Sequence, residues 1–319
     1  MCDLTRLTIP TLACALLLSA CSGEADNDSI EVSGSATVAP ITGAMAAQGR
    51  FDVNVAAEGT IDGFERFCAG ETAINDASTA IPAEALATCE ENGVEFVELP
   101  IGLDALTVVR HEKNDFATDL TSAELAAIFE PGSTVTTWSD VRSTWPDEEI
   151  ALFGRGSGSG TFDFFTHTIN GEAGAIRDDY RHTDDMAELA TWIAEDENAL
   201  GFMGVGNYLA ADEEQRDLIT NVAVDGVMPA LAETQDGSYL LARPLFIYVS
   251  TAAIEEDPRV GEFVDYYVEY APDVLPRVRF YPFADETYGA VQERWSDRTP
   301  GAMFGGEQFV TDVEAGLEG

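Results

Sequence analysis

The chain has 319 residues, of which 58 are acidic and 16 basic, so its formal charge is −42. A surface this acidic repels polyanions, and the charge therefore argues against a protein that binds DNA or RNA. An apolar content of 45% is typical of a soluble chain with a packed core, and the length suits one large domain or two medium ones.

The first 21 residues have the pattern of a bacterial lipoprotein signal peptide. Residues 7–18 are mostly apolar and follow Arg6, and the segment ends in the sequence LSAC, which resembles a lipobox. The apolar run is too short for the alternative, a lone transmembrane anchor, and no later stretch is apolar for long enough to span a bilayer. We therefore expect export, with Cys21 carrying the lipid and residues 22–29 forming a flexible tether.

The five cysteines are consistent with an exported protein. Cys2 and Cys14 lie in the predicted signal peptide and Cys21 takes the lipid, which leaves Cys68 and Cys89. In an exported chain these two are expected to form a disulfide, which closes a short loop and stabilises the fold by about 3 kcal/mol. A metal site needs more ligands than these, and with only three histidines in the chain we expect neither a metal nor another cofactor.

Strands and helices alternate through the first third of the mature chain. The pattern predicts strands at 30–33, 51–57, 72–78 and 94–99, and helices in the run up to residue 48 and at 64–69 and 82–92. A repeated unit of strand, turn, helix and strand is typical of a parallel α/β sheet.

The rest of the chain continues this pattern with longer connections. Two runs read as buried strands, at 103–110 and 244–250, because they are apolar almost without interruption. Thr121 and Glu124 form a capping box that starts a helix at 121–129. Further strands are predicted at 150–153, 199–203 and 218–224, further helices at 162–169, 184–196, 258–270 and 284–295, and a tail with little periodicity at 300–319.

A turn rich in Gly and Ser, RGSGSGT at residues 155–161, connects the predicted strand at 150–153 to an aromatic helix. The start of a helix presents unpaired N–H groups and partial positive charge, to which Ser159 and Thr161 add hydroxyls and Arg155 a full charge. This combination suits a small oxyanion. The alternative is a plain interdomain linker, which rarely contains an arginine or adjoins an aromatic helix.

Two other turns have the same form, at residues 35–38 and 59–60, each with Ser or Thr before a helix and after a strand. Any one of them could be ordinary helix capping. In open α/β sheets, however, ligands sit at the carboxyl ends of the strands, where three such turns would converge. In so acidic a chain an anion has to be bound by local donors of this kind rather than by the overall field.

Over residues 30–297 the chain resembles the phosphate-binding protein of the bacterial high-affinity phosphate ABC transporter. The segments that carry the resemblance are GSATV at 34–38, EGTIDG at 58–63 and, most specifically, Arg155-x-x-x-Ser159-Gly160-Thr161, with further likeness at 64–71 and 105–109. The resemblance implies a phosphate-clamping arginine, hydroxyl ligands and backbone N–H donors. The implied ligands are Thr37, Val38 (through its N–H), Thr60, Arg155, Ser159, Gly160 and Thr161.

The third loop departs from the family pattern. Many members place an aspartate there, which accepts the proton of hydrogen phosphate and repels fully ionised sulfate. Here the loop is NDASTA at 75–80, and Asp76 lies two residues before the matching position, which falls near Ser78. Either residue could be the ligand, so selectivity against sulfate is less secure than binding. Ser157 stands where some members have an acid that pairs with the arginine.

The resemblance also implies the fold and the partners. We expect an α/β, two-lobed periplasmic-binding-protein fold of type II, with the ligand between the lobes and two strand crossings. Lobe one would comprise residues 30–103 and 248–319, and lobe two residues 104–247. The protein would be a lipid-anchored, extracytoplasmic monomer that captures inorganic phosphate and delivers it to the membrane permease of an ABC transporter.

Three alternatives differ in class. The same fold could bind sulfate, molybdate or a phosphonate, or could sense phosphate rather than transport it. A secreted hydrolase is disfavoured, because neither Ser157 nor Ser159 lies in a Gly-x-Ser-x-Gly elbow and the chain lacks a Gly-Lys-Ser/Thr nucleotide loop. We therefore expect a binding protein and not an enzyme.

Overall fold

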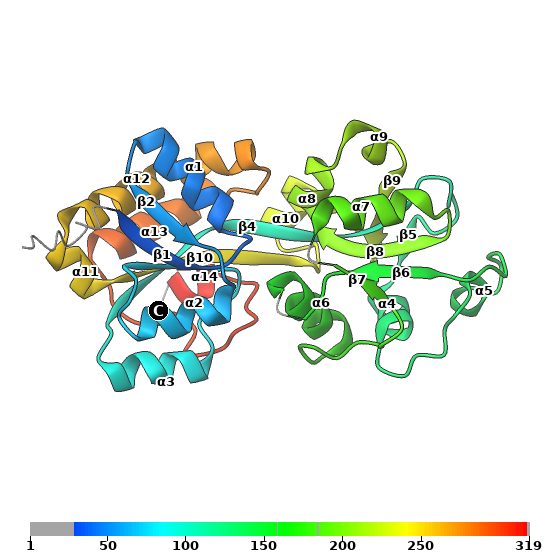
Figure 1. Ribbon diagram of the computed structural model, residues 1–319, viewed down its shortest axis with the longest axis horizontal. Helices are drawn as coiled ribbons and strands as arrows, with labels where there is room; N and C mark the ends of the chain where they lie inside the picture. The colour runs from blue at the N-terminus through cyan, green and yellow to red at the C-terminus, as the bar shows by residue number, and fades with distance from the viewer. Residues whose placement is uncertain (1–28, 158, 184, 318–319) are drawn as a thin grey trace, which may run out of the picture.

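The computed structural model of the chain describes residues 29–157, 159–183 and 185–317. The predicted signal peptide with Cys21, and almost all of the predicted tether, lie outside these residues. Within them, no helix has the length and hydropathy needed to cross a membrane. The described chain forms two α/β lobes joined by strands β4 (Phe96–His111) and β10 (Ala242–Ser250), which confirms the predicted two-lobed architecture (Figure 1).

One mixed sheet runs through both lobes. Besides β4 and β10, its strands are β1 (Ile30–Gly34), β2 (Val53–Ala56), β3 (Ile74–Ala77), β5 (Asp119–Leu120), β6 (Ala151–Gly154), β7 (Arg181–His182), β8 (Ala199–Gly204) and β9 (Ile219–Val224). Their order is β2-β1-β3-β10-β4-β8-β6-β7, with β9 paired to β4 and to β5. β1, β2 and β3 pair in parallel as predicted, and β6 pairs in parallel with β7 and β8, as does β5 with β9. The two crossing strands depart from this pattern, because β10 runs antiparallel to β3 and β4, and β4 antiparallel to β8 and β9.

Lobe one contains β1, β2, β3 and helices from both ends of the chain. These helices are α1 (Ala39–Gly49), α2 (Thr60–Cys68), α3 (Ala83–Asn92), α11 (Thr251–Glu256), α12 (Pro258–Val274), the 3-10 helix η1 (Leu275–Val278), α13 (Asp285–Ser296) and α14 (Glu314–Leu317). They cover a core that includes Phe64, Phe246 and Tyr267, all fully buried. Cys68 on α2 and Cys89 on α3 form the expected disulfide. The predicted tail is more ordered than its periodicity indicated, because it contains α14 and the carbonyl of Gln308 accepts from Ala80 N at 3.1 Å.

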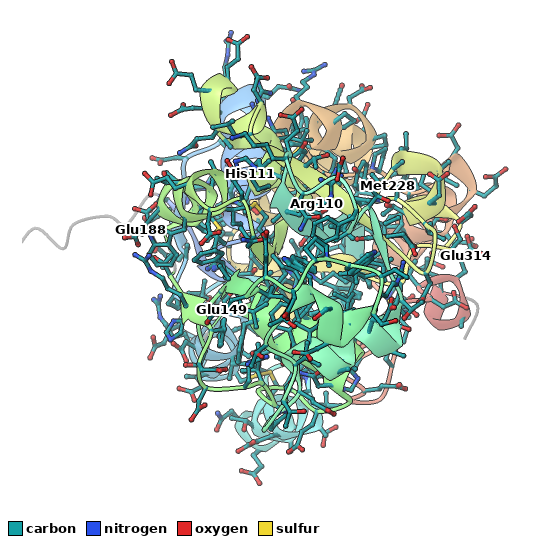
Figure 2. All side chains as sticks on the ribbon, turned by 90° about the vertical axis from the view of Figure 1, so that its right-hand side faces the viewer. Arg110, His111, Glu149, Glu188, Met228 and Glu314 are labelled. Atoms are coloured by element: carbon teal, nitrogen blue, oxygen red, sulfur yellow. A yellow bond between two sulfur atoms is a disulfide. The ribbon has the colours of Figure 1, made fainter. Side chains whose placement is uncertain are left out.

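Lobe two contains the remaining strands and its own core. Its helices are α4 (Ser122–Phe129), α5 (Trp138–Val141), α6 (Gly160–Asn170), α7 (Met186–Glu195), α8 (Val205–Ala210), α9 (Glu213–Arg216) and α10 (Leu231–Gln235). The rings of Phe165 and Phe202 stack in this core, and Phe129 packs edge-on against both. Figure 2 looks onto the end of this lobe, with buried Arg110 and His111 toward the middle of the view.

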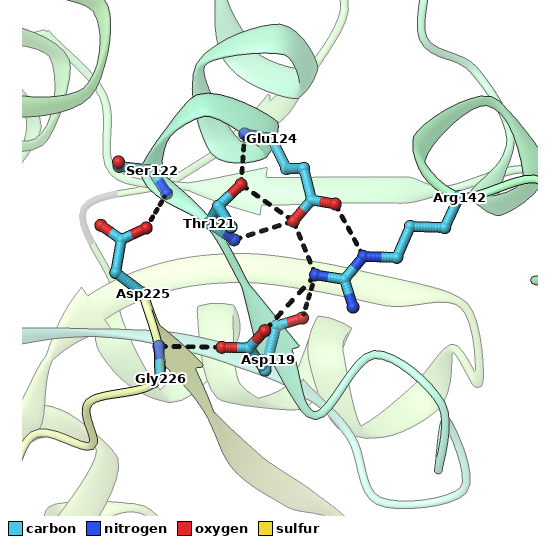
Figure 3. A network of polar contacts seen from close by, with 7 residues as sticks. All are labelled: Asp119, Thr121, Ser122, Glu124, Arg142, Asp225 and Gly226. Carbon is cyan, nitrogen blue, oxygen red and sulfur yellow. Dashed lines mark hydrogen bonds and ion pairs between the residues drawn. The ribbon is translucent and has the colours of Figure 1, made fainter.

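The capping box predicted at the start of α4 is present. Thr121 Oγ1 accepts from Glu124 N at 3.1 Å, and Glu124 accepts in return from Thr121 N at 2.8 Å (Figure 3). Arg142 extends the motif, since its Nε and Nη2 donate to the two Glu124 carboxylate oxygens at 2.6 and 2.7 Å. A local sequence signal thus fixes the start of the helix, and a distant arginine reinforces it.

The prediction of separate strands at 94–99 and 103–110 was wrong, because β4 is a single strand of 16 residues, all of them buried. Pro100 and Gly102 look like a break in the sequence, since neither favours a strand interior. The register against β10 shifts between Leu245 and Phe246, so that Ile101 is bulged and the strand continues. β4 therefore runs without interruption from the core of lobe one into the core of lobe two.

Candidate functional site

A cavity of about 610 Å³ lies between the two lobes. Lobe one contributes the loops that precede α1 and α2 and the segment around η1, and lobe two contributes the start of α6 together with α7 and α8. The lining residues are Ser35, Ala36, Thr37, Pro40, Ala57, Glu58, Gly59, Thr60, Asp104, Arg155, Ser159, Gly160, Thr161, Met186, Gly204, Gly206, Asn207, Ala210, Arg277, Val278, Arg279 and Phe280. Six of the nine predicted ligands are among them: Thr37, Thr60, Arg155, Ser159, Gly160 and Thr161.

The first loop follows β1 and is held tightly against the third. Gly34 has φ +119, and an added Cβ would lie 2.0 Å from the carbonyl oxygen of Asp76, so only glycine fits there. Ser35 N donates to that same oxygen at 2.8 Å. This contact positions Thr37, which lines the cavity. Val38, by contrast, is fully buried, and its N–H donates to Ser35 O at 3.1 Å within the turn rather than facing the cavity.

The second loop places Thr60 at the first position of α2. Gly59 before it has φ +123, which favours glycine. Thr60 Oγ1 lies 3.1 Å from Ser78 Oγ and accepts from Ser78 N at 3.2 Å. The second and third loops thus form one hydrogen-bonded unit at the carboxyl ends of their strands.

The two candidates in the third loop face opposite ways. Both carboxylate oxygens of Asp76 accept from Thr42 Oγ1, at 2.8 and 2.9 Å, and Thr42 in turn contacts Tyr267 Oη at 3.2 Å. Asp76 is fully buried there, outside the cavity lining, and desolvation raises its pKa to about 8. Ser78 instead lies beside Thr60, with its Oγ 2.6 Å from where a Cβ on Gly160 would stand. Of the two, Ser78 is therefore the residue at the junction of the lobes.

Lobe two contributes the start of α6. Ser159 is the N-cap residue and Gly160 the first helical residue, so the N–H groups of the first turn have no partner within the helix, and this helix end lines the cavity. Arg155 lines the same wall, where its Nη1 approaches Met186 Sδ at 3.3 Å and its carbonyl accepts from Tyr180 Oη at 2.7 Å. Hydroxyls, helix N–H groups and one guanidinium together form a set of donors for an oxyanion.

The sequence did not lead us to predict a buried ion pair that adjoins this wall. Arg243 on β10 donates through Nε and Nη2 to Asp104 Oδ2 on β4, at 3.1 and 2.9 Å. Burial raises the pKa of Asp104, and the charge of Arg243 limits the rise. Arg243 also donates to Gly160 O at 2.5 Å. A signal did exist, because Asp104 lies within one strand predicted to be buried and Arg243 directly precedes the other, and a buried charge requires a partner.

The cavity also has a wall that the three turns did not predict. Arg277 and Arg279 line it from η1 and the residue that caps it, opposite Gly206 and Asn207 of α8. No feature of the local sequence marks this segment as part of the site, since it follows the C-terminal end of α12. Within the described residues, no cluster of three His, Cys, Asp or Glu side chains suitable for a metal is present.

Comparisons with a family model, with protein sequences and with solved structures all find relatives of this chain. A family model described as the PBP superfamily domain matches residues 20–269. Protein SphX of Synechocystis is 38% identical over an alignment that covers 99% of this chain and 97% of that protein. The phosphate-binding protein PstS of Staphylococcus aureus is 29% identical, with 87% of each chain covered. A crystal structure described as a possible phosphate binding protein from Planctomyces limnophilus superposes with a TM-score of 0.67 at 35% identity, covering 85% of this chain and 98% of that one.

Proposed function

Because the chain belongs to the PBP superfamily, we propose that it is an extracytoplasmic solute-binding protein that captures inorganic phosphate and delivers it to the permease of an ABC transporter. The observation that carries the proposal is the shared cavity wall, to which Thr37 and Thr60 contribute from lobe one and Arg155, Ser159 and Thr161 from lobe two. A tetrahedral anion bridged by both sets would favour the closed arrangement of the lobes.

The proposed ligand set is Thr37, Thr60, Ser78, Arg155, Ser159, Gly160 and Thr161. Ser78 is included ahead of Asp76 because of its contact with Thr60, and Val38 is left out because its N–H is used within the first turn. Asp76 would not contact the ligand. It would position α1 through the hydrogen bond from Thr42, and the first loop through the hydrogen bond that its backbone carbonyl accepts from Ser35 N. The lobes would divide near residues 103 and 248, at the two crossing strands.

The proposal includes the location and state of the protein. A lipid on Cys21 would hold it at the outer side of the membrane, where it would act as a monomer that binds its ligand without catalysis. The cavity lining supports binding over hydrolysis, since its described residues include hydroxyls but neither histidine nor cysteine as a base or nucleophile.

Isothermal titration of the phosphate-free protein tests the function. Orthophosphate should give saturable heat, and Arg155→Ala should weaken binding by about 1.5–3 kcal/mol, because a charge-assisted contact is removed. Arg216→Ala is the matched control, since this exposed arginine of α9 lies outside the cavity lining. Absence of heat with phosphate at both low and high salt would refute the proposal.

One observation favours a second candidate, a broader oxyanion-binding protein. Neither Asp76 nor Ser78 is in the cavity lining, but the Asp76 carboxylate is hydrogen-bonded to Thr42, whereas Ser78 contacts the lining residue Thr60 and can both donate and accept a hydrogen bond. A hydroxyl does not reject a fully ionised anion as an acceptor-only carboxylate does. Titration with sulfate in place of phosphate distinguishes the two, because a selective phosphate site would give sulfate at least a hundredfold weaker binding, which is about 2.7 kcal/mol.

A further inference from the structure

The interlobe cavity is much larger than orthophosphate. Its volume of about 610 Å³ falls in the range of about 300–1,000 Å³ that is usual for ligands of many heavy atoms, whereas orthophosphate has five. The space does not come from widely parted lobes, because they already touch on two sides. A Cβ on Gly160 would lie 2.6 Å from Ser78 Oγ, and one on Gly206 would lie 3.3 Å from Arg279 O.

The two ends of the cavity differ in chemistry. One end is formed by the loops with Thr37 and Thr60 and by the start of α6, whose donors are hydroxyls and N–H groups beside the guanidinium of Arg155. The other end is lined by Arg277 and Arg279, and the carbonyl of Arg279 lies close to Gly206 of α8. The arginines are on an anchored segment, since Leu275 is fully buried and Leu103 of β4 exchanges backbone hydrogen bonds with Tyr281 at 2.8 and 3.0 Å.

Positive charge at the arginine end is not cancelled within the cavity. The cavity lining contains two carboxylates, and each is paired with an arginine outside the lining. Asp104 pairs with Arg243 at 2.9 Å, and Glu58 pairs with Arg66 at 3.0 Å. Arg277 donates to the neutral Gln48 at 2.8 Å, and within the described residues neither Arg277 nor Arg279 has a carboxylate partner. Two guanidinium groups without counter-ions, in a chain of charge −42, mark a place for an anion.

We propose that the cavity takes, besides orthophosphate, a phosphate whose substituent is itself anionic, such as a condensed phosphate. The first phosphoryl group would occupy the proposed site at the start of α6, and the second anionic group would be bound by Arg277 and Arg279. The inference rests on the proposed function for the position of the first group. It adds a second subsite and a class of larger ligand.

The probes are orthophosphate, inorganic pyrophosphate and methyl phosphate, each titrated into the phosphate-free protein in the presence of a chelator. Methyl phosphate is the control for size, because its substituent adds bulk without charge. The proteins are the wild type, Arg277→Ala, Arg279→Ala, the double variant and Arg216→Ala. The last removes one exposed positive charge outside the cavity and so reports the effect of net charge alone.

Pyrophosphate should bind the wild type and compete with orthophosphate. The double variant should weaken pyrophosphate by about tenfold or more, because two charge-assisted contacts are lost, but orthophosphate and methyl phosphate by less than about threefold. Arg216→Ala should change none of the three by more than about twofold.

Two results would overturn the inference. One is that orthophosphate binds and pyrophosphate neither binds nor competes, in which case the proposed function stands and the second subsite falls. The other is that the double variant weakens all three ligands equally, which would make the two arginines a source of general attraction rather than a subsite. If orthophosphate itself fails to bind, the proposed function fails on its own titration.

Discussion

Arg243 and Asp104 pair directly across the two strands that join the lobes. They are register partners in the β10–β4 ladder, and their side chains, 1% and 4% exposed, form an ion pair at 2.9 Å. Because Arg243 also donates to Gly160 O, the junction of the lobes and the start of α6 are held by one guanidinium. The same ion pair therefore stabilises the two strands that join the lobes and positions the start of α6 at the proposed anion site.

Replacing Arg243 by methionine should lower the free energy of unfolding by about 3–5 kcal/mol, since Asp104 would be left buried without a partner. Urea unfolding measures the loss. Adding Asp104→Leu should restore much of it, because an apolar pair of similar volume removes the unpaired charge. If Arg243→Met is as stable as the wild type, the ion pair does not stabilise the two strands that join the lobes.

Much of the fold follows from the sequence, but the site follows only in part. The crossing strands and the three turns were predicted because apolar runs and Gly-Ser-Thr turns are local signals. The orientation of the Asp76 side chain could not be predicted, because it depends on contacts with Thr42 and, through Thr42, with Tyr267, which come from distant segments of the chain. The arginines at 277 and 279 follow a helix end that carries no anion-site signal, and only the packing of lobe one brings them to the cavity.

Asp76 should make stability depend on pH. Its pKa is about 8 in the folded protein, raised by desolvation, against about 3.9 in an unfolded chain. Between these values the folded protein keeps a proton that the unfolded chain has lost, so the contribution of Asp76 to stability falls as pH rises and levels off above about 8. The slope is at most about 1.4 kcal/mol per pH unit.

Asp76→Asn isolates this effect, because asparagine has the same shape and no proton to lose. The stability of the wild type relative to the variant should decline between pH 5 and pH 8 in urea unfolding. Thr42→Val is the companion variant, since it removes the donor that lowers the pKa of Asp76, and it should move the plateau to higher pH. A difference that is constant with pH would show that Asp76 titrates normally.

Glu124 should give the opposite dependence. The hydrogen bonds from Arg142, followed by those from Thr121, lower its pKa to about 2, below the usual value of about 4.3 (Figure 3). Its contribution is therefore present above pH 4 and is lost as the pH falls toward 2. Glu124→Gln should cost about 1–2 kcal/mol at pH 7, as expected for a helix cap, and almost nothing near pH 2. Glu149→Gln, at an exposed position of the same lobe, is the control, and a cost equal to that of Glu124→Gln would contradict the assignment.

The disulfide between Cys68 and Cys89 should stabilise lobe one by about 3 kcal/mol, because it closes a loop with a sequence separation of 21 between α2 and α3. Cys68→Ala/Cys89→Ala should show this loss in urea unfolding. Reduced wild-type protein is the control that changes no side-chain volume apart from the thiols. If reduction leaves stability unchanged while the double variant loses it, the effect comes from packing and not from the crosslink.

Gly160 is a point of close contact between the lobes. A methyl group there would stand 2.6 Å from Ser78 Oγ, closer than non-bonded atoms approach. Gly160→Ala should therefore keep the lobes apart and weaken phosphate by about tenfold or more, in line with about 1–3 kcal/mol for overpacking. Gly289→Ala on α13 is the matched control, since an added Cβ meets nothing within 4 Å.

A double-mutant cycle with Ser78→Ala separates the steric effect of Gly160→Ala from the loss of a ligand. If Ser78 binds phosphate and the clash acts only through its hydroxyl, Ser78→Ala alone should weaken binding by about 0.5–1.5 kcal/mol. Adding Gly160→Ala to Ser78→Ala should then cost little more, because the atom that the methyl would strike is gone. The two changes would thus be strongly non-additive, as is usual for residues in contact. Additive losses in isothermal titration would mean that Gly160→Ala acts on the start of α6 itself, and the contact between the lobes at this point would not govern closure.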